Sequence, residues 1–296
     1  MNTVTQAPAD ADVPDRKDAP RMRAPVSVVI PCFRCAKTID EAVASIAAQT
    51  LPPAEVLLVD DASGSETVEA LHRVAAAYDA DWIKVIVLPA NGGPSLARNT
   101  GWERAQQPYV ALLDADDTWA PRKLELQMAA LDADPAIALI AHQMPVRARG
   151  TPAPEPQLPV QVRIVGRRTL LVRNPFPTSS VVLRRDLPFR FDEAFRRSED
   201  YLLWSRIVFS GYRCAKIDQV LAIANRREAG DVGLSDDFAA VHHGRAVLRR
   251  KLTQEGLLNY REYLYASVVG VVNKARLKFL RRMRHLRGRV SSHGHA

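Results

Sequence analysis

The chain has 296 residues, 47% of them hydrophobic and 25% charged, with a formal net charge of +8 at pH 7. This composition is ordinary for a soluble globular protein, and the length allows one large core, or one core with a small appendage. No apolar run approaches the roughly 18 residues of a membrane-spanning helix, and the N-terminus lacks the basic-then-apolar pattern of a secretory signal. The sequence therefore predicts a cytoplasmic protein.

The charge is distributed unevenly. Residues 245–289 contain 13 Lys and Arg against Glu255 and Glu262, a net charge of +11, which leaves −3 for the rest of the chain. Residues 1–24 are rich in Ala, Pro and Asp with few large apolar side chains, so they are predicted to be disordered. We expect three segments: the disordered segment 1–24, a folded domain 25–236 and a basic helical tail 237–296.

Strand and helix patterns alternate in the first half of this domain. Apolar, β-branched runs predict strands at 26–30, 56–59, 83–88 and 109–113. Between them, apolar residues recur at helical spacing after a potential cap at Thr38, over 68–75 and from Ser95. This order predicts an α/β fold with a mostly parallel sheet covered by helices on both faces.

The second half of the domain has a less regular pattern. Pro121 suits the first turn of a helix, and residues 137–141 form a predicted strand. Residues 145–161 carry five prolines and are expected to form a surface loop or insertion. A short predicted strand at 181–183 is followed by a helix that begins after Ser198.

Three of the predicted strands end in unusual residues, at 31–33, 60–61 and 114–117. In sheets of this kind, ligands bind outside the carboxyl ends of the strands. We therefore expect the three clusters to meet at one edge of the sheet.

The third cluster contains three carboxylates within four positions. In an extended chain Asp114 and Asp116 would point to one side and Asp117 to the other. Two carboxylates on one side of a strand end can hold a divalent cation such as Mg²⁺ or Mn²⁺ and leave coordination sites for a diphosphate. The alternative is a solvated acidic turn.

Two other ways of holding a diphosphate are excluded. The first strand-to-helix turn, residues 31–36, contains none of the glycines that a dinucleotide-binding fingerprint requires, and no phosphate-binding loop with the glycine–lysine pattern occurs.

Cys32 and Cys35 in this turn have C-x-x-C spacing, but no second pair exists to complete a zinc site. Three cysteines, with Cys214, are too few for a disulfide framework.

Five short motifs follow one another along the chain. They are Val-Ser-Val-Val-Ile-Pro at 26–31, Val-Asp-Asp-Ala-Ser at 59–63, Ala-Arg-Asn-Thr-Gly at 97–101, Leu-Asp-Ala-Asp-Asp at 113–117 and Ser-Glu-Asp at 198–200. In the identity and order of these motifs, the chain resembles the family 2 glycosyltransferases of the GT-A fold from about Val26 to Ile223. The resemblance implies that residues 25–236 form a GT-A domain that transfers a sugar, with inversion, from a nucleoside-diphosphate sugar to an acceptor hydroxyl.

The resemblance also implies roles for particular residues. Those implied to bind the donor nucleotide are Pro31, Phe33, Asp60, Asp61, Arg98 and Asp114. Asp116, together with Asp114, would hold the divalent metal, Mg²⁺ or Mn²⁺. Asp200 would be the general base, with Glu199 beside it near the acceptor.

Each of these residues also has a purely structural interpretation. Asp60 and Asp61 could cap the following helix, and Phe33 could belong to the core. Arg98 could pair with Glu103 on the surface, and the pair Glu199-Asp200 could only begin a helix. Three of the four tryptophans, Trp102, Trp119 and Trp204, are expected to serve packing.

The tail leaves two interpretations open. Its apolar face and basic end, from Tyr260 to Leu286, suit a helix that lies on anionic lipid at the inner face of the cell membrane, near a glycan or lipid-linked glycan acceptor. The same helix could instead pack on the domain with its basic end in solvent.

Nucleic-acid binding is not expected, because aromatic stacking positions are missing among the arginines. Intact Asp116 and Asp200 favour an enzyme over a non-catalytic nucleotide- or carbohydrate-binding module.

Overall fold

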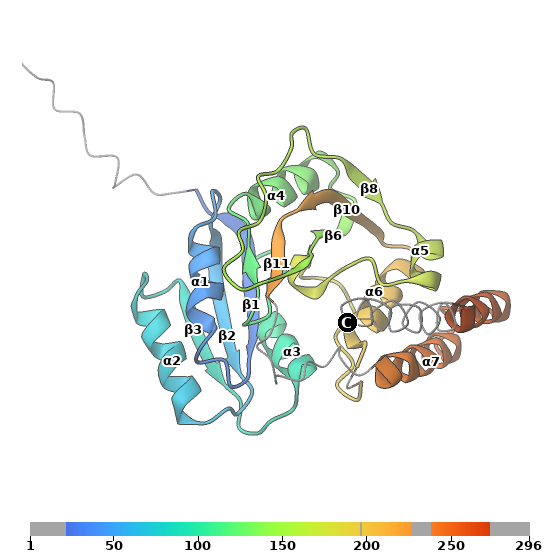
Figure 1. The fold of residues 1–296 in the computed structure, drawn as a ribbon, viewed down its shortest axis with the longest axis horizontal. Coiled ribbons are helices and arrows are strands. Elements are labelled where there is room, and N and C mark those ends of the chain that lie inside the picture. The colour runs from blue at the N-terminus through green and yellow to red at the C-terminus, as the bar shows by residue number, and fades with distance from the viewer. Residues whose placement is uncertain (1–21, 196, 226–237, 273–296) are drawn as a thin grey trace, which may run out of the picture.

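The computed structural model describes residues 22–195, 197–225 and 238–272 (Figure 1). Its first half alternates strands and helices as expected. The elements are β1 (Ala24–Cys32), α1 (Ile39–Ala47), β2 (Pro53–Asp60), α2 (Ser65–Ala76), β3 (Ile83–Val87), α3 (Pro94–Arg104), β4 (Tyr109–Leu112) and β5 (Thr118–Trp119). β1 begins at the buried Ala24, one residue before the predicted start of the folded domain, and residues 1–21 lie outside the described part.

The second half contains shorter elements. They are α4 (Lys123–Ala133), β6 (Ile137–Gln143), β7 (Val146–Arg147), β8 (Val162–Ile164), α5 (Arg167–Val172), the 3₁₀ turn η1 (Thr178–Ser180), β9 (Val182–Arg184), α6 (Glu199–Phe209), β10 (Arg213–Val220), β11 (Ala222–Asn225) and α7 (Phe238–Gln254). A further helix covers residues 260–272. The domain boundary predicted at residue 236 lies outside the described residues.

The central sheet has the strand order β3-β2-β1-β4-β9-β6-β10-β8. Pairs β1–β2, β2–β3, β1–β4 and β6–β10 are parallel, whereas β9 runs antiparallel between β4 and β6, and β8 is an antiparallel edge. The expectation of a mostly parallel α/β sheet is confirmed. Since β1 and β2 are joined to their neighbours in parallel, their carboxyl ends lie at the same edge as that of β4.

Helices cover both faces of this sheet (Figure 1). Alternate residues of β1 enter two separate core clusters: Val28 packs with α1, α2 and α4, and Val29 packs with α3 and α6. This alternation follows from the two-residue side-chain period of a strand. Trp102 and Trp204 are fully buried and Trp119 nearly so, which confirms that the tryptophans pack in the core.

Several local predictions differ from the structure. Thr38 and Ser198 directly precede α1 and α6 as expected, but neither caps its helix through its side chain; the Thr38 hydroxyl donates to the carbonyl of Cys35. Helix α3 begins at Pro94, after Gly93 with φ of 88°, rather than at Ser95. The proline-rich stretch 145–161 is not wholly a loop, because it contains β7, which pairs with β11.

The first part of the tail packs on the domain. Leu248 and Leu252 of α7 are buried against α6, and Leu258 joins the same cluster. In the three described stretches of the chain, no helix combines the length and apolarity needed to cross a membrane. Residues 273–296, which carry most of the arginines of the tail, lie outside the described residues.

Helix α3 lies unusually close to β1, and we predict that Gly101→Ala destabilises the protein. A Cβ atom at Gly101 would lie 2.3 Å from Cγ1 of Val29, a buried β-branched side chain that has no room to move. Overpacking of this kind costs about 1–3 kcal/mol. Gly270→Ala is the matched control: its new Cβ would lie 3.6 Å from the nearest atom, so greater helix propensity should stabilise it by about 0.5–1 kcal/mol. Urea unfolding measures both, and equal stability of the two variants would contradict the close packing.

Candidate active site

An acidic turn follows β4. The strand ends at Leu112, and the amide of Asp117 donates to the carbonyl of Asp114 at 3.0 Å, so these residues are not extended as the sequence analysis assumed. Asp114 and Asp116 are half-buried, whereas Asp117 is buried and accepts a hydrogen bond from Oγ of Ser179 at 2.6 Å. Asp117 therefore differs from the other two carboxylates in burial, and a turn replaces the extended chain from which opposite side-chain directions were expected.

A buried guanidinium connects this turn to α6. Nη2 of Arg98 donates to Oδ1 of Asp114 at 2.8 Å, and Nη1 donates to Oε1 of Glu199 at 3.2 Å. The side chain of Arg98 is only 7% exposed and also stacks over the ring of Phe191. A surface pairing of Arg98 with Glu103 is thereby excluded. One side chain of α3 thus holds together two acidic clusters that lie far apart in the sequence.

The 3₁₀ turn η1 makes a second connection. Oγ of Ser179 accepts from the amide of Asp114 at 3.0 Å and donates to Asp117, and Oγ1 of the adjacent Thr178 donates to Oδ2 of Asp200 at 3.3 Å. Nδ2 of Asn174 donates to the same oxygen of Asp200 at 2.9 Å. The acidic turn and the first turn of α6 therefore share neighbours on η1 as well as on α3.

The crowding of carboxylates changes their protonation. Burial, and next the charge of Glu199, raises the pKa of Asp200 to about 6. Burial, together with the charges of Asp114 and Asp116, raises the pKa of Asp117 to about 8. Burial alone would lower the pKa of Arg98, but the charges of Asp114 and Glu199 outweigh it, and this pKa is raised. At neutral pH the site thus has a cation at its centre, a deprotonated Asp200 and a largely protonated Asp117.

The residues implied to bind the base lie at the ends of β1 and β2. Phe33 is 48% exposed, which excludes the core interpretation, and its ring is covered on one side by the guanidinium of Arg34. Pro31 is half-buried beside it in the chain. Asp60 is fully buried; one oxygen accepts from the amide of Ser63 and the other has no hydrogen-bond partner in the described structure.

Asp61 has a different environment. Its two oxygens accept from the amides of Gly92 and Gly93, both at 2.8 Å, and the side chain is buried. Asp61 therefore fixes the turn before α3 rather than capping α2. Because α3 carries Arg98, this contact ties the end of β2 to the acidic cluster.

A divalent cation fits the acidic turn. Asp114 and Asp116 offer the carboxylate oxygens that Mg²⁺ and Mn²⁺ prefer, at a half-exposed position. Among the described residues, no group of three His, Cys, Asp or Glu side chains is arranged to hold a metal by itself. Two carboxylates are nevertheless typical of Mg²⁺ sites in which a phosphate group of the substrate completes the coordination.

Sequence reasoning missed the residues that position the acids. Thr178 and Ser179 lie between Pro177 and a buried strand, a place that indicates a constrained turn, but the sequence assigned them no role. Asn225 was also missed; its Nδ2 donates to the carbonyl of Asp116 at 2.9 Å. Their hydroxyl and amide groups were the only feature of the sequence that could have indicated a role in positioning the acids.

Cys32 and Cys35 are buried thiols beside this edge of the sheet. Burial raises the pKa of Cys32 well above its usual value, whereas a hydrogen bond from Cys32 holds the pKa of Cys35 below it. Neither thiol belongs to a metal cluster of the described residues.

Solved structures share this architecture. The chain superposes with a TM-score of 0.61 on Staphylococcus aureus TarS 1–349 solved with UDP-GlcNAc, at 22% identity, over 78% of this chain and 66% of that one. It superposes with a TM-score of 0.58 on the mannosyltransferase PcManGT from Pyrobaculum calidifontis solved with GDP-Man and Mn²⁺, at 20% identity, over 91% and 83% of the two chains. At these identities the likeness shows the fold, which is that of GT-A proteins.

Sequence similarity extends the assignment from fold to family. Residues 27–192 match the sequence model of Glycosyl transferase family 2, more than half of the chain, and the chain belongs to this family. The succinoglycan biosynthesis protein ExoO of Rhizobium meliloti is 30% identical over 203 residues, which cover 64% of this chain. The match spans 57% of the length of ExoO.

We predict that Arg98→Met destabilises the protein by about 3 kcal/mol, because removing one partner of a buried ion pair leaves the other charges uncompensated. Asp114 and Glu199 would then face each other without a cation. Arg104→Met, at the exposed end of the same helix, is the control and should change stability by less than about 0.5 kcal/mol. Urea unfolding at pH 7 measures both variants. Equal losses in the two would show that the Arg98 contacts are dispensable.

Proposed function

We propose that this protein is an inverting glycosyltransferase that moves a sugar from a nucleoside-diphosphate sugar to a hydroxyl of a glycan or lipid-linked glycan acceptor. The observation that carries the proposal is the bridge of Arg98 between Asp114 and Glu199. Asp114 is suited to the donor and Glu199 lies next to Asp200, which is suited to the acceptor. Because one guanidinium contacts both Asp114 and Glu199, the donor and acceptor acids lie close together. Family membership, and a relative named for succinoglycan biosynthesis, support bacterial surface polysaccharide as the setting.

The acceptor side of the proposed reaction needs a base. The acceptor oxygen forms a bond to the anomeric carbon while the bond from that carbon to the diphosphate oxygen breaks, and the hydroxyl proton passes to a carboxylate oxygen of Asp200. A pKa of about 6 leaves Asp200 deprotonated at neutral pH and close to the value at which a base is most effective. One displacement with one base inverts the anomeric centre.

The donor side needs compensation of negative charge. Asp114 and Asp116 would hold a divalent cation, which would act as a Lewis acid on the departing diphosphate. Phe33, exposed at the end of β1, offers a ring face on which a base can stack. Asp61, whose two oxygens already accept from backbone amides, would accept from a ring N–H with a remaining lone pair. Support for this arrangement comes from the fold neighbours, which were solved with UDP-GlcNAc and with GDP-Man and Mn²⁺.

We expect Asp116→Ala to lower the turnover number by about a hundredfold or more, because a metal contributes several kcal/mol of charge stabilisation. Donor binding should weaken in the presence of Mn²⁺ and change little in its absence. Thermal shifts with a panel of UDP- and GDP-sugars, with and without Mn²⁺, measure binding, and product formation measures turnover. Asp132→Ala, an exposed acid on α4, is the control and should behave like the wild type. Normal turnover in the Asp116 variant would refute the metal-binding role.

Asp200→Asn should lower the turnover number by roughly 10²–10⁴-fold, the usual contribution of a general base. In the wild type, turnover should rise with pH through about 6, because Asp200 is protonated and inactive below its raised pKa. Glu199→Gln removes a negative charge that raises this pKa, so the rise should occur at lower pH. A pH profile of single-turnover rates tests both variants. An unchanged profile in Glu199→Gln, with normal rates in Asp200→Asn, would assign the base elsewhere.

A further inference from the structure

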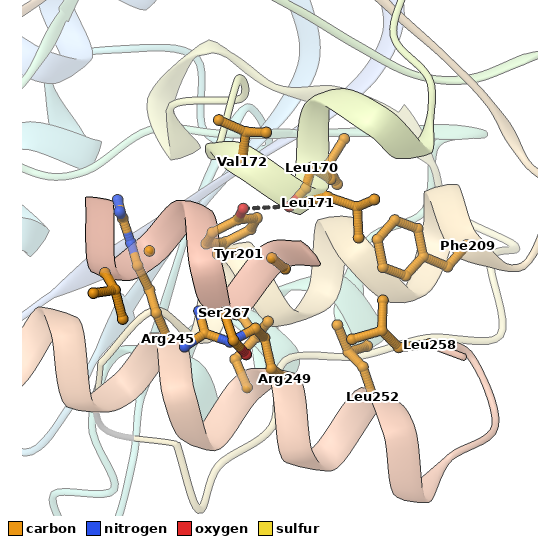
Figure 2. A pocket seen from close by; sticks show the side chains of 14 residues that line it. Leu170, Leu171, Val172, Tyr201, Phe209, Arg245, Arg249, Leu252, Leu258 and Ser267 are labelled. Atoms are coloured by element: carbon orange, nitrogen blue, oxygen red, sulfur yellow. Dashed lines mark hydrogen bonds between the residues drawn. The ribbon is translucent and has the colours of Figure 1, made fainter. Parts of the chain in front are cut away.

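A cavity lies beside Tyr201, the residue that follows Asp200. It has a volume of about 190 Å³ and is enclosed by α5, α6, α7 and the helix 260–272 (Figure 2). Aliphatic and aromatic side chains form most of its wall, including Leu170, Phe209 and Leu252. An apolar cavity of about 150 Å³ is enough to bind benzene in an engineered protein, so this one can hold several methylene groups.

The wall of the cavity is polar at one end only. Arg245 and Arg249 reach it from α7, beside Tyr201, while Phe209 and Leu258 lie at the opposite end (Figure 2). The Tyr201 hydroxyl donates to the carbonyl of Leu170. The cavity therefore has a cationic end and an apolar end, which is the complement of an amphiphilic anion.

The two arginines have no counter-ion among the described residues. Neither forms an ion pair there, Nε of Arg249 is buried without a hydrogen-bond partner, and Arg245 only approaches the ring of Tyr201 at 5.9 Å. They lie four residues apart on one helix, where like charges repel. Burial lowers the pKa of Arg249, and the charge of Arg245 acts in the same direction. Both side chains are half-buried, and a partly desolvated cation without a partner gains from a charge-assisted contact, so an external anion is the expected complement.

Neighbouring cations in the same helical layer are paired differently. Arg206 binds both Asp192 and Glu255, Arg167 binds Glu262, and Lys251 binds Asp192. The chain therefore supplies carboxylates to several other cations of this layer. Arg245 and Arg249 differ from these in lining the cavity without a carboxylate partner among the described residues.

The apolar wall continues onto the outer surface. Val271 lines the cavity and is also 69% exposed. It belongs to a set of exposed apolar side chains on the helix 260–272: Tyr260, Leu264, Tyr265, Val268, Val271 and Val272. An apolar group that is too long for the cavity could thus extend along this helix. Exposed apolar patches of this kind mark binding surfaces.

We propose that this cavity binds a single-chain lipid phosphate, with the phosphate at Arg245 and Arg249 and the chain among the leucines. A free phosphate would leave the apolar wall unused, a neutral chain would leave the arginines unpaired, and the first methylene groups of one chain already fill the cavity. The position beside Asp200 suits the carrier end of a lipid-linked acceptor, an identification that rests on the proposed function. Binding itself does not depend on sugar transfer.

Calorimetric titration of the full-length protein with monomeric dodecyl phosphate tests the proposal. The wild type should bind, and Arg249→Gln should bind roughly tenfold more weakly or worse, the loss expected for a charge-assisted hydrogen bond. Arg250→Gln is the matched control, since Arg250 is exposed on the same helix, and it should bind like the wild type. Gly270→Leu adds a side chain to the cavity wall without changing a charge and should also prevent binding, so the test stands even if Arg249→Gln unfolds.

Three further probes identify what is recognised. Dodecanol and inorganic phosphate should each bind at least about tenfold more weakly than dodecyl phosphate, because each uses only one end of the cavity. Equal binding of either probe, or equal weakening by the Arg250 control, would overturn the proposal. So would stronger binding of phosphatidylglycerol vesicles that Arg249→Gln abolishes, since it would assign the site to bilayer lipid. Asp200→Asn should leave dodecyl phosphate binding unchanged, which separates failure of this site from failure of the proposed transfer reaction.

Discussion

The buried guanidinium of Arg98 is the interaction on which the site depends. It neutralises parts of two acidic clusters that would otherwise repel each other, and it is held by a helix whose position is fixed at both ends. At the start of α3, Asp61 binds the amides of Gly92 and Gly93; near its end, Gly101 packs directly on Val29. Between them, Asn99 exchanges hydrogen bonds with the backbone of Phe191. The residues from Ala97 to Gly101, which lie within α3, thus contact both the sheet, through Gly101, and α6, through Arg98.

Two acids of the site have raised pKa values, with burial as the first cause in both, but their surroundings differ. Asp117 is buried beneath two carboxylates and binds Ser179, so it is largely neutral near pH 7. Asp200 accepts bonds from Asn174 and Thr178, and the charge of Arg98 lowers its pKa, which is about 6 rather than about 8. Because Thr178 and Ser179 are adjacent, the turn η1 contributes to both environments. The same turn therefore helps to determine which of the two acids carries a charge.

Much of the fold could be predicted from the sequence, because β1, β2 and β4 are continuous apolar runs and the helices between them have clear periodicity. The expectation that their ends meet at one edge is borne out by the sheet order. Strand β10 was not predicted, because Lys216 and Asp218 interrupt its apolar pattern while its neighbours in the sheet bury the rest. The partners of Arg98 could not be predicted either, since Glu199 is 101 residues away and local rules carry no information on such contacts. The prediction of side-chain caps was wrong for a local reason. A glycine or another residue with positive φ precedes α2, α3 and α6, and no side chain caps these helices.

If Asp61 has its proposed role as an acceptor for the nucleotide base, its environment has a consequence for ligand recognition. A carboxylate on a flexible side chain loses conformational freedom when it binds a ligand, at about 0.5–1.5 kcal/mol for a side chain with many rotamers. Asp61 is already immobilised by two backbone amides, so this loss occurs during folding. A donor group on a nucleotide base would therefore meet an acceptor whose orientation is set in advance. Selectivity at this position would then depend on the shape of the ligand rather than on adjustment of the protein.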